Sequence, residues 1–257
     1  MIVVAIISHK GGTGKTSTAV NLSAGLAAME YRVLTLDANE QGDLSDTLAA
    51  EPGTGGMADL LAGEDVTRLI RKTNIPKVDI VTGDERLANV ERIVKAVGAA
   101  RGTILKDALN PVRKKYQFVV IDAPGSFNVT MLNALCAADR AVVTAQPDYY
   151  SLKGINRLIK NIRFVQRELN HKLVVDGILL TRYQGRRNVS KEVVATLEEA
   201  QTILGTRLFN AKIRENTKVA EAPREHKTVL EYAPGSIGAE DYREFINEYM
   251  GMIKEEQ

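Results

Sequence analysis

The sequence has a single cysteine, Cys136, and no long hydrophobic run. One cysteine excludes an intrachain disulfide, and its place within the apolar stretch 132–138 predicts a buried thiol. No apolar segment approaches the roughly 20 residues that a membrane-spanning helix requires. The chain enters an apolar strand at Ile2 with no basic leader before it. We therefore expect a soluble, cytosolic protein.

The composition lacks the biases that mark disordered or collagen-like chains. Of 257 residues, 44% are hydrophobic and 26% are charged, and we find no internal repeat or low-complexity tract. This length can bury one large core, so we predict a single domain over residues 1–257. The Gly/Pro cluster at residues 51–57 is predicted to be a surface loop inside that domain.

The chain as a whole has almost no excess of either charge sign, but one part of it is clearly basic. The formal net charge is only +2. Residues 151–227 nevertheless hold 16 Lys/Arg against 8 Asp/Glu, whereas the rest holds 18 against 24. This asymmetry suggests a surface for a polyanion on the C-terminal half, although solvated helices can produce it too.

Short β-branched runs alternate with longer segments of helical periodicity. The runs begin at residues 2, 32, 78, 118, 141 and 174, and the helices are predicted at 16–29, 102–115, 152–169, 190–204 and 239–252. This alternation predicts an α/β fold with a doubly wound, mostly parallel sheet flanked by helices. Ligands of such sheets bind at the carboxyl ends of the strands.

A glycine loop, Ser-His-Lys-Gly-Gly-Thr-Gly-Lys-Thr at residues 8–16, follows the first strand directly and precedes a helix. Glycines let backbone N–H groups surround phosphate oxygens, and the helix N-terminus adds partial positive charge. Lys15 supplies a cation and the Thr16 hydroxyl can ligate Mg²⁺. The strict phosphate-loop pattern fails at His9, and an extra lysine, Lys10, precedes the paired glycines. We predict phosphate binding of a P-loop NTPase type by Lys10, Gly11, Gly12, Thr13, Gly14, Lys15, Thr16 and Ser17.

Two further strands end in carboxylates, at Asp37 and at Asp122. A doubly wound sheet brings such strand ends beside the first loop. Asp122, before Ala-Pro-Gly, is the natural partner of Thr16 in holding Mg²⁺, directly or through water. The alternative is an aspartate that only caps the next turn. Gly125 follows, where backbone groups could sense a γ-phosphate.

The loop Lys-Gly-Gly-Thr-Gly-Lys-Thr resembles the deviant Walker A motif of the ParA/MinD ATPases. Segments beginning at Leu36, Val119, Gln146, Gly177 and Val219 resemble ParA/Soj-type partition ATPases in the same order, over essentially the whole chain. The resemblance implies a P-loop NTPase fold, ATP and Mg²⁺ as cofactors, and a homodimer formed on ATP binding. It also implies that Lys10 reaches the partner's phosphates, so that nucleotide state controls association.

One position departs from the family pattern. After the second strand the family usually carries Asp-x-Asp-Pro-Gln, whereas this chain has Asp-Ala-Asn-Glu-Gln at 37–41. An amide can orient water but cannot accept its proton. We therefore expect slow hydrolysis, with Lys10, Lys15, Asp37 and Asn39 as the catalytic set. Glu40 could compensate; alternatively, Asn39 merely closes a turn.

By the same resemblance, the ATP-bound dimer binds DNA without sequence specificity and is nucleoid-associated in the cytoplasm. Contacts with phosphates would make binding salt-dependent. The predicted DNA-binding residues are Arg186, Arg187, Lys191, Lys212, Arg214, Lys218 and Arg224. Within the family motif Pro-Arg-Asn-x-Arg, this chain has Arg-Glu-Asn-Thr-Lys at 214–218. Because the replaced proline lies near the adenine, Arg214 and Asn216 are also predicted nucleotide contacts.

We therefore predict a switch ATPase for DNA segregation or cargo positioning, released by a ParB-like or other cargo adaptor. A MinD-like membrane regulator would need a basic amphipathic C-terminus, but the chain ends Lys-Glu-Glu-Gln and we expect no membrane partner. The apolar positions Tyr242, Phe245, Ile246, Tyr249 and Ile253 favour core packing instead. A cluster-binding enzyme would need paired cysteines. An ATP-gated binding module with negligible hydrolysis remains an alternative because of Asn39.

Overall fold

The computed structural model describes residues 1–97, 102–184 and 191–255. Its centre is an eight-stranded sheet in the order β3-β4-β2-β5-β1-β6-β7-β8, mostly parallel, with β3 antiparallel to β4. The strands are β1 (Ile2–Ile7), β2 (Val33–Asp37), β3 (Arg71–Lys72), β4 (Val78–Val81), β5 (Phe118–Asp122), β6 (Arg140–Ala145), β7 (Val174–Tyr183) and β8 (Leu208–Arg214). The predicted doubly wound α/β fold is confirmed.

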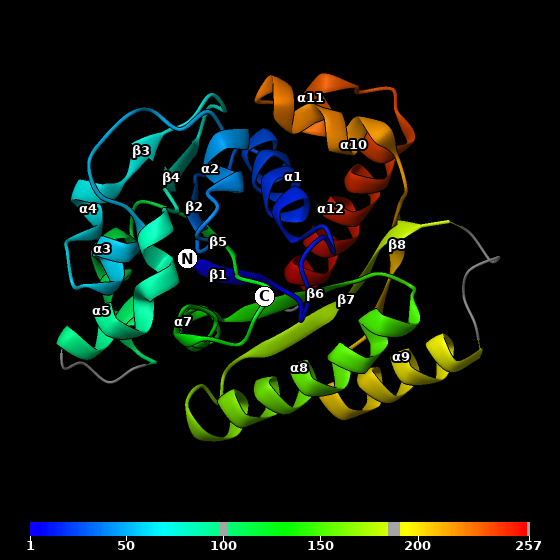
Figure 1. Cartoon of the computed structure of the whole chain (residues 1–257). Helices are drawn as coiled ribbons and strands as arrows, with labels where there is room; N and C mark the ends of the chain where they lie inside the picture. Colours follow the sequence, from blue (N-terminus) through cyan, green and yellow to red (C-terminus); the bar gives the residue numbers. More distant parts are fainter. Residues whose placement is uncertain (98–101, 185–190, 256–257) are drawn as a thin grey trace.

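The helices cover both faces of the sheet, with α1, α11 and α12 on one side and α7, α8 and α9 on the other (Figure 1). Their bounds are α1 (Lys15–Ala28), α2 (Asp43–Thr47), α3 (Met57–Leu61), α4 (Val66–Leu69), α5 (Val90–Val97), α6 (Ile104–Ala108), α7 (Val129–Ala137), α8 (Tyr149–Glu168), α9 (Lys191–Leu204), α10 (Thr217–Glu221), α11 (Val229–Tyr232) and α12 (Ile237–Glu255). Two hydrophobic layers result, and central strands buried on both faces explain the continuous apolar runs.

The register of the strands determines which residues lie together at the carboxyl edge of the sheet. The strand β5 lies between β1 and β2, with Ile6 and Asp37 both paired in register with Asp122. The loop after β1 and the two acidic strand ends therefore emerge at one level. This edge is where a doubly wound sheet binds its ligand.

The predicted helix at 102–115 is wrong as a single element. Only Ile104–Ala108 is α-helical, and a 3-10 turn follows at Asn110–Val112. Pro111 has no N–H to continue the helical hydrogen bonds, and it disfavours a helical conformation at the residue before it. The prediction also missed β8, an edge strand whose exposed positions include Asn210 and Arg214, so that its apolar run is broken.

Several packing predictions are confirmed. Cys136 is buried, and the five apolar positions of the C-terminal helix are all buried between α1 and the sheet. In the loop at 51–57, residues 51–54 are exposed, whereas Met57 already begins α3 and is buried. Within the described part of the chain, no helix combines the length and apolarity needed to cross a membrane.

The C-terminal helix depends on an aromatic cluster. Phe245 is fully buried, and its ring meets that of Phe209 edge-on at 5.1 Å between centroids. Phe245→Ala is expected to lower the free energy of unfolding by about 3–5 kcal/mol, because the cavity adds to the lost burial. Urea denaturation measures it. The matched control is Phe164→Ala on α8, where the side chain is 46% exposed; a comparable loss there would contradict the packing assignment.

Candidate functional site

The loop between β1 and α1 has a backbone shape that only glycine adopts readily. Gly12 and Gly14 have φ of 74° and 76°, in the left-handed region that side chains disfavour. Gly14 is also the N-cap of α1, and no side chain caps that helix. The first N–H groups of α1 are therefore left for a ligand, and with the helix dipole they form an anion site.

The two lysines of the loop differ in environment. Lys15 is buried, and its Nζ donates to Ser8 Oγ at 3.1 Å and to the Lys10 carbonyl at 3.2 Å. Burial lowers the pKa of Lys15, and the charge of Asp122 opposes this. The side chain of Lys10 is exposed. One cation therefore lies inside the loop and the other faces outward.

Beneath the loop, Thr16 and Asp122 form a polar pair suited to a cation. Thr16 Oγ1 donates to Asp122 Oδ2 at 2.6 Å. The Asp122 carboxyl is fully buried, and its Oδ1 has no hydrogen-bond partner among the described residues. Burial, and then the charge of Asp37, raise the pKa of Asp122 to about 7. A buried oxygen without a donor, beside a hydroxyl, fits Mg²⁺, which is commonly held by one or two protein oxygens and waters.

Asp37 lies beside Asp122, but its oxygens are occupied. They accept from Ser45 N at 2.9 Å, Ser45 Oγ at 2.7 Å and Asn39 N at 3.2 Å. Burial raises the pKa of Asp37 to about 6, against these hydrogen bonds. Ser45 Oγ also accepts from Gly83 N at 3.1 Å. In this arrangement Asp37 holds the start of α2 and the chain at Asn39.

Asn39 and Glu40 line a cavity of about 300 Å³ together with Gly12, Lys15 and Thr16. Asn39 Nδ2 donates to the Asp122 carbonyl at 3.3 Å, and the side chain is half-buried. The predicted phosphate and hydrolysis residues are thus brought together. The described residues contain no group of three His, Cys, Asp or Glu that could form an all-protein metal cage.

A second cavity, of about 420 Å³, lies on the other side of the loop and also contains Gly12, Lys15 and Thr16. Its remaining lining comes from α1, the start of α2, the ends of β7 and β8, α10 with its N-cap, and α12. These residues include Ser17, Asp43, Thr181, Arg182, Arg214, Asn216 and Tyr242. Burial raises the pKa of Tyr242 to about 12. The first cavity is suited to the phosphates of a nucleotide, and the second is suited to its nucleobase.

Arg214 and Asn216 line this second cavity, yet both are engaged within the protein. Arg214 Nε donates to Asp241 Oδ1 at 2.9 Å, and its Nη2 pairs with Glu240 at 3.1 Å. Asn216 caps α10 by accepting from Lys218 N at 2.8 Å. Arg214 therefore lines the cavity as an ion-paired guanidinium rather than as a free cation, and Asn216 lines it as a helix cap.

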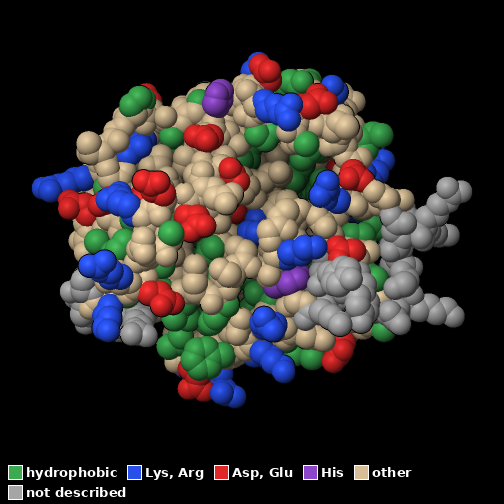
Figure 2. Space-filling view, viewed as in Figure 1, with side chains coloured by type: hydrophobic (Ala, Val, Ile, Leu, Met, Phe, Trp, Pro, Cys, Tyr) green, Lys and Arg blue, Asp and Glu red, His purple; other side chains and the backbone are tan. Residues whose placement is uncertain are grey.

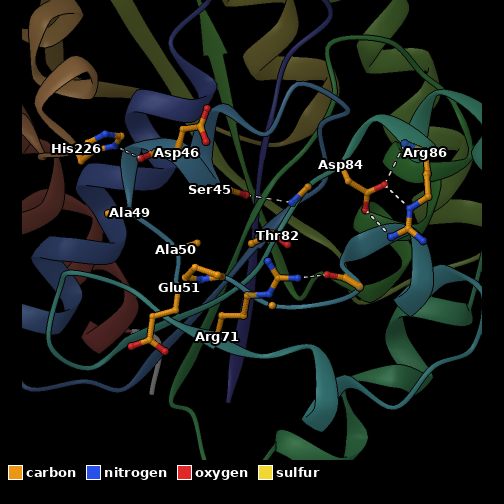
Figure 3. A pocket seen from close by; sticks show the side chains of 14 residues that line it. Ser45, Asp46, Ala49, Ala50, Glu51, Arg71, Thr82, Asp84, Arg86 and His226 are labelled. Carbon is orange, nitrogen blue, oxygen red and sulfur yellow. Dashed lines mark hydrogen bonds and ion pairs between the residues drawn. The ribbon is translucent and has the colours of Figure 1, made fainter.

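A third cavity, of about 510 Å³, is lined by Ser45, Glu51, Arg71, Asp84 and His226 among others, and by no residue of the phosphate loop (Figure 3). Arg71 donates to the Gly55 carbonyl, and Arg86 pairs with Asp84. Two residues that line this third cavity, Ser45 and Gly83, are also linked to Asp37: Ser45 Oγ donates to Asp37 and accepts from Gly83 N.

The sequence reasoning missed three residues that hold the loop from β6 and β7. Thr181 Oγ1 donates to the Thr13 carbonyl at 2.8 Å, and Thr144 and Thr13 share a hydroxyl hydrogen bond of 3.2 Å. Gln146 Nε2 donates to the Gly12 carbonyl at 2.6 Å. All three stand at or just after the carboxyl ends of predicted strands, which is the signal that could have identified them.

Among the described residues predicted to contact DNA, most have a partner within the protein. Lys218 pairs with Glu221 at 2.8 Å, Arg214 pairs with acids of α12, and Lys212 lies 5.2 Å from the Tyr183 ring centre. Arg224 is exposed. Arg186 and Arg187 lie outside the described residues, as does the side chain of Lys191. On the face in Figure 2, basic and acidic side chains are interspersed.

Comparison with known proteins identifies the family. Residues 1–175 match a family model described as an AAA domain. The sporulation initiation inhibitor protein Soj of Bacillus subtilis is 34% identical over 96% of this chain and 97% of its own length. The chromosome partitioning protein ParA of Caulobacter vibrioides is 36% identical over 99% and 96%.

Solved structures agree on fold and cofactors. The septum site-determining protein MinD of Pyrococcus horikoshii, complexed with Mg-ADP, is 25% identical, covers 96% of this chain and 95% of its own, and has a TM-score of 0.76. A cobyrinic acid a,c-diamide synthase of Mycobacterium smegmatis, with bound ATP analogue and magnesium, is 25% identical, with coverages of 100% and 97% and a TM-score of 0.83. The expectation of ATP and Mg²⁺ is confirmed at the level of the family. The chain belongs to the ParA/MinD family of ATPases.

Proposed function

We propose that this protein is a cytoplasmic, nucleoid-associated ATPase of one domain that positions or segregates DNA or another cargo. ATP binding would produce a homodimer that holds nonspecific DNA, and slow hydrolysis stimulated by a cargo-side adaptor would release it. One observation carries the proposal: a glycine loop with an inward Lys15 and an outward Lys10 lies over the hydrogen bond from half-buried Thr16 to the buried carboxyl of Asp122. The similarity to Soj and ParA over almost the full length of the chain supports a role in segregation or positioning.

In this proposal the chain's residues divide the work of phosphate binding. Lys15 and the first amides of α1 neutralise the phosphates, and Thr16 and Asp122 hold Mg²⁺. When bound, Mg²⁺ neutralises phosphate charge in the transition state. Asn39 orients the attacking water without accepting its proton, since a neutral amide has no such capacity. Turnover is consequently slow.

Lys10 is the proposed sensor of the partner's nucleotide. Its side chain is exposed while its carbonyl accepts from Lys15 and from Ser8, so the backbone is fixed and the cation is free to reach outward. A triphosphate carries charge that a diphosphate lacks, so a lysine from a second copy stabilises the ATP state. The proposed DNA contacts are Lys212, Arg214, Lys218 and Arg224, with Arg186, Arg187 and Lys191.

The two lysines should separate binding from association. Lys15→Ala is expected to abolish ATP binding, whereas Lys10→Ala should keep ATP affinity but lose the ATP-dependent doubling of mass and DNA binding. Titration, light scattering and DNA binding with no nucleotide, ADP or ATP plus Mg²⁺ measure these effects. Lys172→Ala, an exposed lysine at the opposite edge of the sheet, is the control. ATP-dependent dimers of Lys10→Ala would reject the cross-subunit role.

Turnover should respond to the amide at Asn39. Asn39→Asp is expected to raise phosphate release by about tenfold, which is less than general-base assistance commonly gives because positioning dominates phosphoryl transfer. Glu40→Gln, in the same cavity, tests the neighbouring carboxylate. If Glu40→Gln instead abolishes turnover and Asn39→Asp changes nothing, Glu40 is the working carboxylate.

The buried carboxylates predict how stability depends on pH without Mg²⁺ and nucleotide. Because the pKa values of Asp37 and Asp122 are raised to about 6 and about 7, their protonated forms are favoured in the folded state. The stabilisation they give at low pH is lost as pH rises from about 4, the ordinary pKa of an aspartate in the unfolded chain, to about 7. Urea denaturation in EDTA should show a weaker decline for Asp122→Asn. Mg²⁺ at the higher pH should stabilise only the wild-type protein; equal responses would contradict the metal assignment.

A further inference from the structure

The helix α8 carries a glycine, Gly154, directly against the ring of His9. A Cβ atom at position 154 would lie 1.5 Å from His9 Cδ2 and 2.0 Å from His9 Nε2. Such distances are far below any tolerable non-bonded contact. The imidazole therefore occupies the space that a side chain would fill, and α8 has a notch at this point.

The backbone of α8 does not itself require glycine there. Gly154 lies within a continuous helix and is not in the left-handed conformation. In a helix interior, glycine is less favourable than alanine. The contact with His9 accounts for this residue, whereas helix formation does not.

His9 stands between the two residues whose oxygens hold Lys15. Ser8 Oγ accepts from Lys15 Nζ and donates to the Lys10 carbonyl at 2.8 Å, and that carbonyl also accepts from Lys15. The Lys10 carbonyl further accepts from Thr13 Oγ1 at 3.3 Å. A displaced ring at His9 would therefore move both anchors of the Lys15 ammonium.

We propose that Gly154 is a positioning residue of the nucleotide site. Its missing side chain allows His9 to pack on α8, which fixes Ser8 and Lys10 and, through them, the Lys15 ammonium. This inference rests on the proposed nucleotide-binding function. It also explains the departure at the first position of the phosphate loop, since the ring of His9 joins the loop to α8 where a glycine would make no such contact.

The direct test is Gly154→Ala, measured by Mg-ATP titration together with thermal unfolding. Affinity should fall by about tenfold or more, because small misplacements of binding groups have large effects. The melting temperature should not fall in parallel, since alanine favours the helix. The matched control is Gly251→Ala in α12, where a Cβ meets nothing within 4 Å; its ATP affinity should equal that of the wild type.

A double-mutant cycle identifies the steric partner. His9→Ala should lower ATP affinity, but by less than Gly154→Ala, because the packing of the ring on α8 is lost while the Ser8 and Lys10 hydrogen bonds persist. His9→Ala/Gly154→Ala should recover the affinity of His9→Ala alone, because the clash is relieved. If the double variant is as impaired as Gly154→Ala, or if Gly154→Ala binds ATP normally, the inference is overturned.

Lys15→Ala in the same assay separates the two proposals. If Lys15→Ala loses ATP binding while Gly154→Ala retains it, only the role of Gly154 fails. If Lys15→Ala keeps wild-type affinity, the nucleotide-site assignment itself fails, and the role of Gly154 fails with it.

Discussion

The hydrogen bond between Thr16 and Asp122 joins the two parts of the molecule on which the site depends. Thr16 is in the first turn of α1, and Asp122 ends a neighbouring strand more than 100 residues later in the chain. The bond is short because β1, β2 and β5 end at the same level. It leaves one carboxylate oxygen of Asp122 buried without a donor. Burying such a group is costly unless a cation completes the site.

Around this bond, the site is held by side chains from the strands on both sides of β1 and the segments that follow them. Thr144 and Thr181 secure Thr13 from β6 and β7, whereas Ser45 and Asn39 secure Asp37 on the β2 side. The loop's shape is therefore set before any ligand arrives. Preorganised donors stabilise developing charge without reorganisation, which suits chemistry that consists mainly of positioning. The slow turnover that we propose would then follow from the amide at Asn39 and not from a poorly formed site.

The notch at Gly154 extends this picture beyond the sheet edge. The helix α8 packs on α9 and on β6, so a ring seated in α8 connects the phosphate loop to the outer layer of that face. Movement of α8 relative to the loop would have to move His9. In a protein that switches conformation with its nucleotide, such steric coupling would transmit a displacement of the phosphate loop to α8, or the reverse.

The sequence by itself determined the fold class, the phosphate loop and the approximate places of the central strands. Buried parallel strands have a local signature of β-branched runs, and a glycine loop between strand and helix is contiguous in the chain. It also placed Asp122 at the end of such a strand, and the resemblance to the family pattern singled out Asn39. The short edge strand β3, the broken helix near Pro111 and the half-exposed strand β8 have no such pattern and were missed or mispredicted.

Only the tertiary structure decided which partners these residues have. Asp37 looks like a free carboxylate in the sequence, but Ser45 and Asn39 occupy its oxygens. Arg214 looks like a free cation in the sequence, but it pairs with Asp241 of the C-terminal helix. Gly154 looks like an unremarked helical glycine until His9 is found against it. Hydrogen bonds, ion pairs and steric contacts form between residues distant in sequence, so the local pattern cannot encode them and the fold decides them.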